Sequence, residues 1–343
     1  MPDLALTYMC RDEVIRAAST VDPLLVVERA LQLHADGQTT LPEEAYLPWR
    51  TSDGRFARSL ALPGAAWGAR SAIGLKVINS SLGNVERGLR RAHGLTLLFD
   101  QETARPYAIL EAEHLSTLRT AAYTAVSVAH LANRPVRRVG IIGCGSIGLA
   151  HVDLISAMEP DAAFVMFDQD LTRAEQARAQ LGSCSVSAVT VPTARTAVEG
   201  ADVVVTATTT THGYIPHDWI EPGALVAHVS LDDLLPDAVA RADLVFVDDW
   251  NLVRDDARRL LGRMYRSGDL LAPGTGPTGP VQGRPRSVDG TLADVISGRH
   301  PGREDARAVI VSNPFGMGIL DVALAAEVEE AARALGLGTE LER

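Results

Sequence analysis

The chain has 343 residues, of which 46% are hydrophobic and 22% are charged, a composition typical of a folded protein with a sizeable core. Its 32 Lys and Arg against 43 Asp and Glu give a formal net charge of -11. An acidic surface repels phosphate backbones, so we expect no nucleic-acid partner. No apolar run reaches about 18 residues, so we expect no membrane span.

Cysteine usage bears on the cellular compartment and on metal binding. Cys10, Cys144 and Cys184 are too few and too irregularly spaced for a disulfide framework. The first twelve residues lack a basic start followed by an apolar run, so no signal peptide is predicted. We therefore expect a cytoplasmic protein. Paired cysteines and His-x-x-x-His spacing are absent from the sequence, so no metal site is predicted.

The first part of the chain, to about residue 130, mixes helix and strand patterns. Apolar residues at helical spacing predict helices over residues 12–18 and 23–35, and Pro23 and Gly37 suit the start and stop of the second. Strand-like runs bounded by Gly and Pro follow at residues 55–62, 71–79, 95–100 and 107–111. A helix is predicted over residues 116–131.

The middle of the chain, from about residue 137 to 313, alternates short apolar runs with helical segments. Strands are predicted at residues 138–142, 163–167, 188–191, 202–206, 224–229, 244–247 and 309–311, with helices at 147–158 and 171–181. Several of these strands are apolar at consecutive positions, as strands buried on both faces are. The alternation predicts a parallel, doubly wound sheet, followed by a helical tail at residues 318–335.

A glycine-rich turn joins the first strand of this sheet to its first helix. Gly143 permits a tight turn, Gly145 lets a pyrophosphate approach the backbone, and Gly148 lets the helix pack closely on the strand. Ser146 and Ile147 begin the helix, where free N–H groups bind phosphate oxygens. These five residues are therefore predicted to bind a dinucleotide.

Three polar residues at the ends of later strands complete the predicted cofactor site. Asp168 lies twenty residues after Gly148, where a carboxylate accepts hydrogen bonds from the ribose hydroxyls. Its charge repels the 2′-phosphate of NADP, so NAD is the predicted cofactor. Thr206 and Thr208 follow another strand and are expected to line the nicotinamide half of the crevice.

Several segments outside the glycine turn resemble the ornithine cyclodeaminase/μ-crystallin superfamily. They are residues 111–122 (EAEHLSTLRTAA), 74–77 (GLKV) and 314–321 (PFGMGILD). The resemblance covers nearly the whole chain. It implies an α/β fold with a central Rossmann-type NAD domain, residues 131–313. This domain is inserted in an α+β substrate-binding and dimerisation domain, residues 1–130 plus 314–343. It also implies a homodimer that binds a small amino-acid substrate between the two domains.

Three further segments are similar to one branch of that superfamily, the dehydrogenases that form 2,3-diaminopropionate. They are residues 46–50 (YLPWR), 58–63 (RSLALP) and 229–234 (VSLDDL). These enzymes use NAD to oxidise an N-substituted glutamate made from O-phosphoserine and glutamate. Hydrolysis of the imine releases 2-oxoglutarate and 2,3-diaminopropionate. The resemblance thus implies NAD-dependent oxidation at the α-carbon of an amino acid or N-substituted amino acid, in siderophore or peptide natural-product biosynthesis.

The resemblance also implies roles for individual cations. Lys76 and Arg119 match the carboxylate-binding positions of the family. Arg119 offers a bidentate fork, and Lys76 is a point charge whose pKa shifts readily on burial, which suits a catalytic role. Arg119 and Thr120 are also expected to contact the cofactor. Arg50 and Arg58 are candidates for binding further carboxylates of the substrate.

Two adjacent aspartates are candidates for the role of catalytic acid/base. In the cyclodeaminases an Asp after the fifth strand of the nucleotide domain has this role, and Asp232 and Asp233 occupy that stretch. Counting from the strand favours Asp232, whereas the branch pattern favours Asp233. Both remain candidates.

One departure from the family bears on the reaction. Cyclodeaminases carry a glutamate that handles the side-chain amine of ornithine, and Leu60 replaces it here. A dehydrogenase acting on a more acidic substrate is therefore favoured. The alternatives are an ornithine or lysine cyclodeaminase, an imine or ketimine reductase, and a non-catalytic binding protein like μ-crystallin.

Overall fold

The computed structural model describes residues 5–182, 186–280 and 284–342, and the chain divides into two compact units. Unit 1 comprises Met1–Arg119 and Gly316–Arg343, and unit 2 comprises Thr120–Phe315. The chain first passes from unit 1 to unit 2 within helix α3 (Ala112–Leu131). The domain boundaries at residues 130 and 314 stay a prediction. Among the described residues, no helix is both long and apolar enough to cross a membrane.

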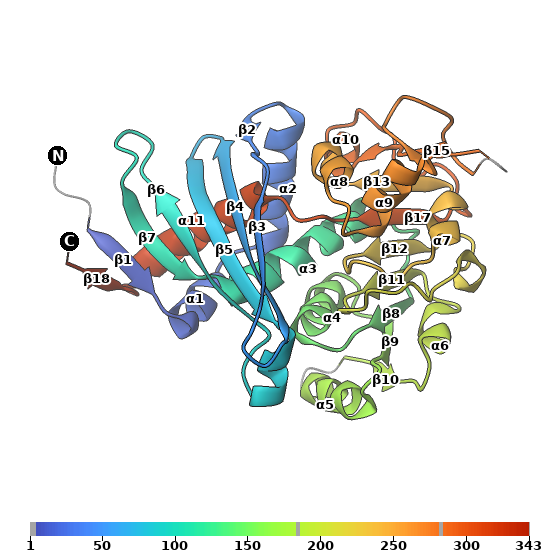
Figure 1. Ribbon diagram of the computed structural model, residues 1–343, viewed down its shortest axis with the longest axis horizontal. Helices are drawn as coiled ribbons and strands as arrows, with labels where there is room; N and C mark the ends of the chain where they lie inside the picture. Colours follow the sequence, from blue (N-terminus) through green and yellow to red (C-terminus); the bar gives the residue numbers. More distant parts are fainter. Residues whose placement is uncertain (1–4, 183–185, 281–283, 343) are drawn as a thin grey trace. The chain divides into compact units, whose positions relative to one another are not determined.

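Unit 1 is built on a mixed sheet with the strand order β18-β1-β7-β6-β5-β4-β2, in which β3 also pairs with β4 (Figure 1). Neighbouring strands are antiparallel except β1 and β7, which are parallel. The strands are β1 (Leu6–Met9), β2 (Thr39–Thr40), β3 (Ala45–Arg50), β4 (Phe56–Trp67), β5 (Ser71–Ser81), β6 (Ala92–Phe99), β7 (Pro106–Glu111) and β18 (Thr339–Leu341).

Strand β4 continues five residues beyond its predicted end at residue 62, through Pro63 and Gly64. On one side of β4, β3 pairs only as far as Ala61, and β2 pairs with Ala65 and Ala66. Pro63 therefore lies in the gap between two short partners, where its missing N–H costs no ladder hydrogen bond. The expectation that the strand ends before the proline was wrong for this reason.

Helix α11 (Gly318–Ala334) covers one face of the sheet and lies behind the strands in Figure 1. The register pairs Gly64 with Gly74 beneath this helix. A Cβ on Gly64 would lie only 2.7 Å from the backbone nitrogen of Ile319, so the helix backbone approaches the sheet closely. Helices α1 (Arg11–Ala18) and α2 (Pro23–Ala35) pack against α11, and a 3-10 turn, η1 (Leu82–Arg87), follows β5.

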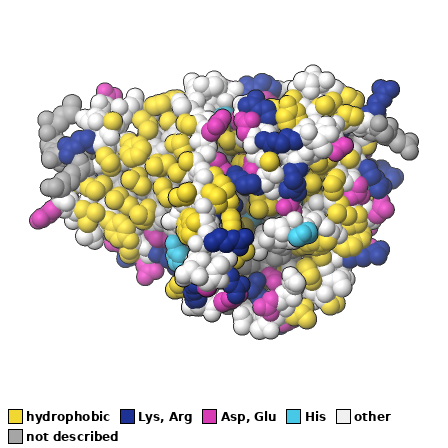
Figure 2. Space-filling model, viewed as in Figure 1, with side chains coloured by type: hydrophobic (Ala, Val, Ile, Leu, Met, Phe, Trp, Pro, Cys, Tyr) yellow, Lys and Arg dark blue, Asp and Glu magenta, His cyan; other side chains and the backbone are white. Residues whose placement is uncertain are grey.

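The other face of the unit 1 sheet carries apolar side chains. Leu75, Val77, Leu95 and Leu97 alternate with the residues that face α11, and Leu95 is 41% exposed. Figure 2 shows hydrophobic side chains gathered over this part of the sheet. None of the described helices of unit 1 covers this face, which we call the open face.

Unit 2 is built on a wholly parallel sheet with the strand order β10-β9-β8-β11-β12-β17-β13-β16. The strands are β8 (Arg138–Ile142), β9 (Ala163–Phe167), β10 (Ala188–Thr190), β11 (Val203–Thr206), β12 (Leu225–His228), β13 (Leu244–Val247), β16 (Gly290–Thr291) and β17 (Ile310–Asn313); β14 (Leu270–Leu271) pairs separately with β15 (Arg286–Ser287). The strand order reverses between β8 and β11, the point where ligands bind in doubly wound sheets.

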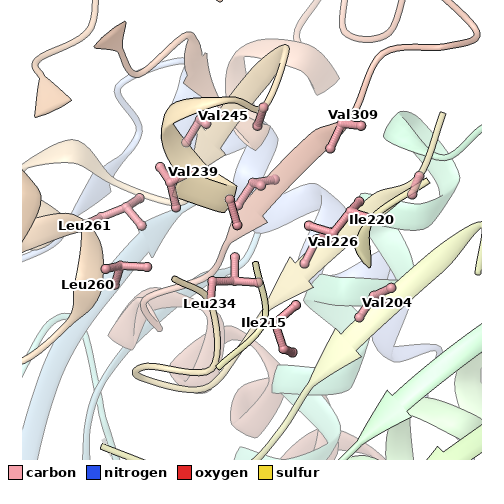
Figure 3. Close-up of a cluster of buried hydrophobic side chains, with 14 of the residues drawn as sticks. Val204, Ile215, Ile220, Val226, Leu234, Val239, Val245, Leu260, Leu261 and Val309 are labelled. Carbon is pink, nitrogen blue, oxygen red and sulfur yellow. The ribbon is translucent and has the colours of Figure 1, made fainter. Parts of the chain in front are cut away.

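Helices connect these parallel strands. They are α4 (Ser146–Met158), α5 (Leu171–Leu181), α6 (Ala194–Val198), α7 (Pro236–Ala240), α8 (Trp250–Asp255), α9 (Leu260–Ser267) and α10 (Leu292–Ile296), with the 3-10 turn η3 (His217–Trp219). Side chains of β11, β12 and β13, such as Val204, Val226 and Val245, form a buried core with Val239, Leu260 and Leu261 from the helices (Figure 3). Every residue of β11 and β12 is buried, as the consecutive apolar pattern indicated. The predicted α/β class with a Rossmann-type sheet is confirmed.

Candidate functional site

The glycine turn of unit 2 lies at the carboxyl end of β8. Gly143 has φ of +98°, and a Cβ there would lie 2.7 Å from the carbonyl oxygen of Ala207. A Cβ on Gly148 would lie 2.0 Å from the carbonyl oxygen of Gly143, so neither position admits another residue unchanged. A Cβ on Gly145 would have no heavy atom within 4 Å, which leaves open space beside the turn.

Helix α4 starts at Ser146, with Gly145 as its N-cap. Ser146 is exposed and Ile147 is half-buried, and the N–H groups of the first helical turn lack helical acceptors. The open space at Gly145 therefore adjoins N–H donors and the positive end of a helix dipole. These residues fit the pyrophosphate of a dinucleotide.

Asp168 follows β9 and is part of the turn itself. Its carboxylate accepts hydrogen bonds from the backbone N–H groups of Cys144 and Asp170, both at 2.9 Å. Arg173 also lies beside it, with its Nη1 3.6 Å from Asp168 Oδ1. Arg173 therefore partly offsets the charge of Asp168, an effect that is not visible in the spacing of the glycine turn. A carboxylate has about four acceptor positions, so Asp168 retains capacity for ribose hydroxyls.

The predicted threonines belong to a buried hydrogen-bond cluster centred on Asp233. Thr208 Oγ1 donates at 2.9 Å to both carboxylate oxygens, Tyr214 donates at 2.6 Å, and Ser230 donates as well. Thr206 joins through Ser230, with 2.7 Å between the two hydroxyl oxygens. Burial raises the pKa of Asp233, while the hydroxyl hydrogen bonds act to lower it. The cluster ties the segment after β11 to the segment after β12.

Asp232 has different surroundings from Asp233. Its Oδ1 forms an ion pair with Arg263 of α9. It also lines a pocket of about 270 Å³ together with apolar residues such as Leu234 and Met264. Asp233 does not line this pocket. Of the two carboxylates, only Asp232 therefore combines a pocket position with a single side-chain partner among the described residues.

In unit 1, Lys76 of β5 and Arg119 of α3 converge on one buried carboxylate. Lys76 Nζ lies 2.8 Å from Asp321 Oδ2, and Arg119 Nε lies 3.0 Å from Asp321 Oδ1. The side chains of Lys76, Arg119 and Asp321 are 3%, 7% and 1% exposed, so this is a desolvated cluster. Burial lowers the pKa of Lys76 to about 8, against the opposing effect of Asp321. Two cations share the Asp321 carboxylate, and the charge of Glu44 also acts on Lys76.

The strand register shows which other cations lie on the same face of the unit 1 sheet as Lys76, which we call the Lys76 face. Lys76 pairs with Leu62, Arg58 pairs with Ser80, and Arg50 pairs with Phe56. Because side chains alternate between the two faces along a strand, Lys76, Arg58 and Arg50 all lie on the same face. Leu60 lies on the same face between Arg58 and Leu62. The Arg50 side chain folds back onto the turn between β3 and β4, where its Nη1 donates to the carbonyl of Gly54 at 3.0 Å. The structure does not bring Arg50 to the Lys76 cluster.

Some residues of these clusters were not singled out from the sequence. Asp321 was noted only within the tail motif, although it holds both predicted carboxylate-binding residues. Tyr214, Ser230 and Arg263 were absent from the predicted site. The partners of Tyr214 and Arg263 lie 19 and 31 positions away along the chain, so the fold rather than a local motif brings them together. Ser230 lies three positions before Asp233, within the same loop. Thr120 directly follows Arg119 on α3 and is half-buried.

Metal-ligand geometry is not found among the described residues. No group of three or more His, Cys, Asp or Glu side chains in that part of the chain is arranged to hold a metal ion. Cys10 and Cys144 are free thiols, and burial raises the pKa of Cys144 to about 12. Cys184 lies outside the described residues.

Comparisons with known proteins agree with the fold and the motifs. N-((2S)-2-amino-2-carboxyethyl)-L-glutamate dehydrogenase of Staphylococcus aureus is 28% identical over 344 residues, 98% of each chain. The crystal structure of CmnK is 42% identical, with a TM-score of 0.90 over 99% of each chain. An archaeal alanine dehydrogenase dimer with bound NAD shares the fold, with 24% identity and a TM-score of 0.83 over 98% of this chain and 99% of that one.

The family model for ornithine cyclodeaminase and mu-crystallin matches residues 8–335, from β1 into the end of α11. This match spans the glycine turn of unit 2 as well as Lys76, Arg119 and Asp321 of unit 1. The resemblance drawn from the sequence is thereby confirmed, and the chain belongs to the ornithine cyclodeaminase/mu-crystallin family.

Proposed function

We propose that the protein oxidises an N-substituted glutamate at the α-carbon of its glutamate part, with NAD as the hydride acceptor. In the overall reaction, N-(2-amino-2-carboxyethyl)glutamate, NAD⁺ and water give 2-oxoglutarate, 2,3-diaminopropionate, NADH and a proton. We assign the reaction to a biosynthetic pathway that uses 2,3-diaminopropionate, as siderophore and peptide natural-product pathways do. The similarity to the Staphylococcus aureus dehydrogenase over 98% of each chain supports this substrate.

The chain is an NAD-dependent oxidoreductase of the amino-acid dehydrogenase and reductase type, acting on a C–N bond. The glycine turn, the open space at Gly145 and the buried Asp168 fit NAD. Bound NAD would supply the hydride acceptor for the carbon that bears the nitrogen. The protein must bind the substrate, orient it and accept the amine proton.

The choice of an N-substituted glutamate as substrate depends on the side chains that share one face of the unit 1 sheet with Lys76. Lys76 and Arg119 supply two cations for the carboxylate at the reacting carbon, beside the charges of Asp321 and Glu44. Leu60 lies between Lys76 and Arg58 on that face and offers no anion to a side-chain ammonium group. A substrate whose far end is a carboxylate suits this face, whereas the ammonium of ornithine does not.

We assign the acid/base role to Asp232 and a positioning role to Asp233. Asp232 borders a pocket and has an oxygen, Oδ2, that accepts no side-chain hydrogen bond from the described residues. This oxygen accepts the proton from the substrate amine as the imine forms. Asp233 is saturated by three hydroxyl donors and holds the loop of Thr208 and Tyr214 in place. Lys76, with a pKa of about 8, can exchange a proton near neutral pH as well as bind a carboxylate.

We also propose that the protein is a cytoplasmic homodimer, joined through the open face of unit 1. That face exposes apolar side chains over β5 and β6, which a partner would remove from water (Figure 2). The related alanine dehydrogenase is a dimer. The free thiols of Cys10 and Cys144 suit a reducing compartment.

The test is an assay of the purified protein with NAD, following NADH by absorbance and products by mass spectrometry. The substrates are the N-substituted glutamate, alanine, ornithine and lysine. We expect one NADH, one 2-oxoglutarate and one 2,3-diaminopropionate per turnover with the first substrate alone. Proline or pipecolate with ammonia and no net NADH would make the protein a cyclodeaminase. Absence of turnover with all four would reject the proposed reaction.

A further inference from the structure

The pocket beside Asp232 lies entirely within unit 2, and one face of helix α9 forms part of its wall. Residues three and four positions apart share a face of a helix. The residues of α9 that line the pocket have this spacing: Leu260, Arg263, Met264 and Ser267. Leu234 and Leu260 also belong to the buried core of unit 2, so the apolar wall of the pocket is continuous with that core (Figure 3).

Charges of both signs line this pocket. Among the described residues, Arg263 is its one cation, and Asp232 and Asp269 are its two anions. The end of α9 holds Asp269 in place, because its N–H donates to the carbonyl of Met264 at 2.8 Å. Gly268, just before it, has φ of +83°, so the helix ends in a Schellman motif. The backbone thus fixes where the Asp269 carboxylate leaves the chain.

Arg263 and Asp269 both have hydrogen-bonding capacity left for a ligand. Arg263 Nη2 pairs with Asp232, and its Nη1 donates to the carbonyl of Arg258 at 2.7 Å. Its Nε–H makes no hydrogen bond within the part of the chain that the structure describes, and the side chain is 45% exposed. Asp269 Oδ2 accepts from Ser267 Oγ at 2.6 Å, whereas Oδ1 accepts from none of the described residues.

The proposed reaction brings a group with two opposite charges to this place. Asp232 takes the proton from the secondary amine, and the 2-amino-2-carboxyethyl group begins one bond from that nitrogen. This group carries one carboxylate and one ammonium. The pocket volume of about 270 Å³ is below the range of about 300–1,000 Å³ that is usual for drug-sized ligands, so it suits a group of this small size.

We propose that the pocket binds the 2-amino-2-carboxyethyl part of the substrate, with Arg263 on its carboxylate and Asp269 on its ammonium group. This inference rests on the proposed function and names the residues that select the substituent on the nitrogen. An arginine binds a carboxylate through charged N–H donors in a fixed orientation. A substituent that lacks the carboxylate leaves Arg263 without its ligand, and one that lacks the ammonium leaves Asp269 without its own.

The experiment measures binding of the released product and of two of its fragments. The NADH-bound protein is titrated by calorimetry with 2,3-diaminopropionate, with 1,2-diaminoethane, which lacks the carboxylate, and with 3-aminopropionate, which lacks the 2-amino group. We expect Arg263→Gln to weaken binding of both carboxylates by about 10- to 100-fold, because it removes a charged hydrogen-bond donor. Binding of 1,2-diaminoethane should not weaken.

A second variant tests the ammonium contact. Asp269→Asn should weaken 2,3-diaminopropionate by about two- to fivefold, a small effect because Asp269 is exposed, and should leave 3-aminopropionate unchanged. The matched control is Arg266→Gln, since Arg266 is an exposed arginine of α9 that does not line the pocket. Leu235→Trp fills the pocket without changing its charge and should abolish 2,3-diaminopropionate binding while NADH affinity and melting temperature stay at wild-type values.

Two results would overturn the assignment of the pocket. One is an equal loss for all three ligands in Arg263→Gln, which would mean that Arg263 only holds Asp232 in place. The other is wild-type binding of 2,3-diaminopropionate in Leu235→Trp. Because these titrations need no turnover, they are independent of the proposed reaction. The expected pattern without oxidation of the N-substituted glutamate would sustain the pocket and reject the reaction, and oxidation without the pattern would do the reverse.

Discussion

Lys76 Nζ lies 2.8 Å from Asp321 Oδ2, and the same carboxylate binds Arg119 through its other oxygen. Asp321 belongs to the first turn of α11, so the N-terminus of that helix adds its own positive field near the carboxylate. Asp321 thus fixes two cations in one orientation and neutralises one of their charges. It is a positioning residue for Lys76 and Arg119, the two carboxylate-binding residues that we call the carboxylate clamp.

Replacing Asp321 should change the pH dependence of substrate binding. Lys76 binds a carboxylate only while protonated, and its pKa is about 8, so KM in the wild type should rise about tenfold per pH unit above that value. The Asp321 charge raises this pKa. In Asp321→Asn the rise in KM should therefore begin at a lower pH, as a KM–pH profile measures. A purely structural role would lower the folded fraction without moving the break. We also expect a loss of stability of about 3 kcal/mol, typical of an uncompensated buried charge.

Truncation of the clamp should separate turnover from cofactor binding. In Lys76→Ala and Arg119→Ala, kcat/KM should fall by roughly two to three orders of magnitude, because truncating one partner of a buried charge pair costs about 2–5 kcal/mol. Lys76 and Gly143 belong to different units, so NADH affinity measured by fluorescence should stay within about twofold in Lys76→Ala. Arg55→Ala is the exposed control. Wild-type turnover in Lys76→Ala would reject its assignment to the site.

The two adjacent aspartates should respond differently to amide substitution. Asp232→Asn should lower kcat by roughly 10²- to 10⁴-fold, the usual contribution of an acid/base, with the melting temperature nearly unchanged. Asp233→Asn leaves three hydroxyl donors without their carboxylate, so it should lower the melting temperature and weaken NADH binding. The opposite pattern, with kcat lost only in Asp233→Asn, would exchange the two roles. Steady-state kinetics and calorimetry on both variants give the answer.

Local patterns were sufficient to predict the strands of unit 2 and the glycine turn. The predicted ranges 138–142, 163–167 and 244–247 match β8, β9 and β13 residue for residue. Each is a short apolar run between polar or glycine residues, so the signal lies within one segment. Strand β3 was not predicted as a strand, because Pro48 interrupts its pattern and five of its six residues are exposed. Its pairing with β4 depends on a tertiary contact at the sheet edge.

Most parts of the candidate site that escaped prediction depend on long-range contacts or on the geometry of an irregular loop. Arg119 and Asp321 are 202 positions apart, and no local pattern links them. The choice between Asp232 and Asp233 depends on which way each side chain leaves an irregular loop, which neither helical nor strand periodicity describes. In each case the residue type is visible in the sequence, whereas its partner is set by the fold.

A charge on the open face should block dimer formation. We expect Val77→Glu to convert a dimer to a monomer in light scattering coupled to size-exclusion chromatography, because it would bury an unpaired carboxylate in an apolar interface. The matched control is Leu171→Lys, a charge at a 55% exposed leucine of unit 2. A dimer that survives Val77→Glu, or a wild-type monomer at micromolar concentration, would rule out this face as the interface.

Replacing Asp168 should change the choice of cofactor. This carboxylate repels the 2′-phosphate of NADP, but Arg173 lies 3.6 Å away and is 47% exposed. In Asp168→Ser the repulsion is removed and Arg173 becomes available to the phosphate. We expect the ratio of kcat/KM for NADP to that for NAD to rise at least about tenfold, equivalent to about 1.4 kcal/mol. Adding Arg173→Gln should cancel most of the gain, since the phosphate then loses its cation. If the ratio stays at the wild-type value in Asp168→Ser, the carboxylate serves only to accept the backbone N–H groups of Cys144 and Asp170, and cofactor selection lies elsewhere in unit 2.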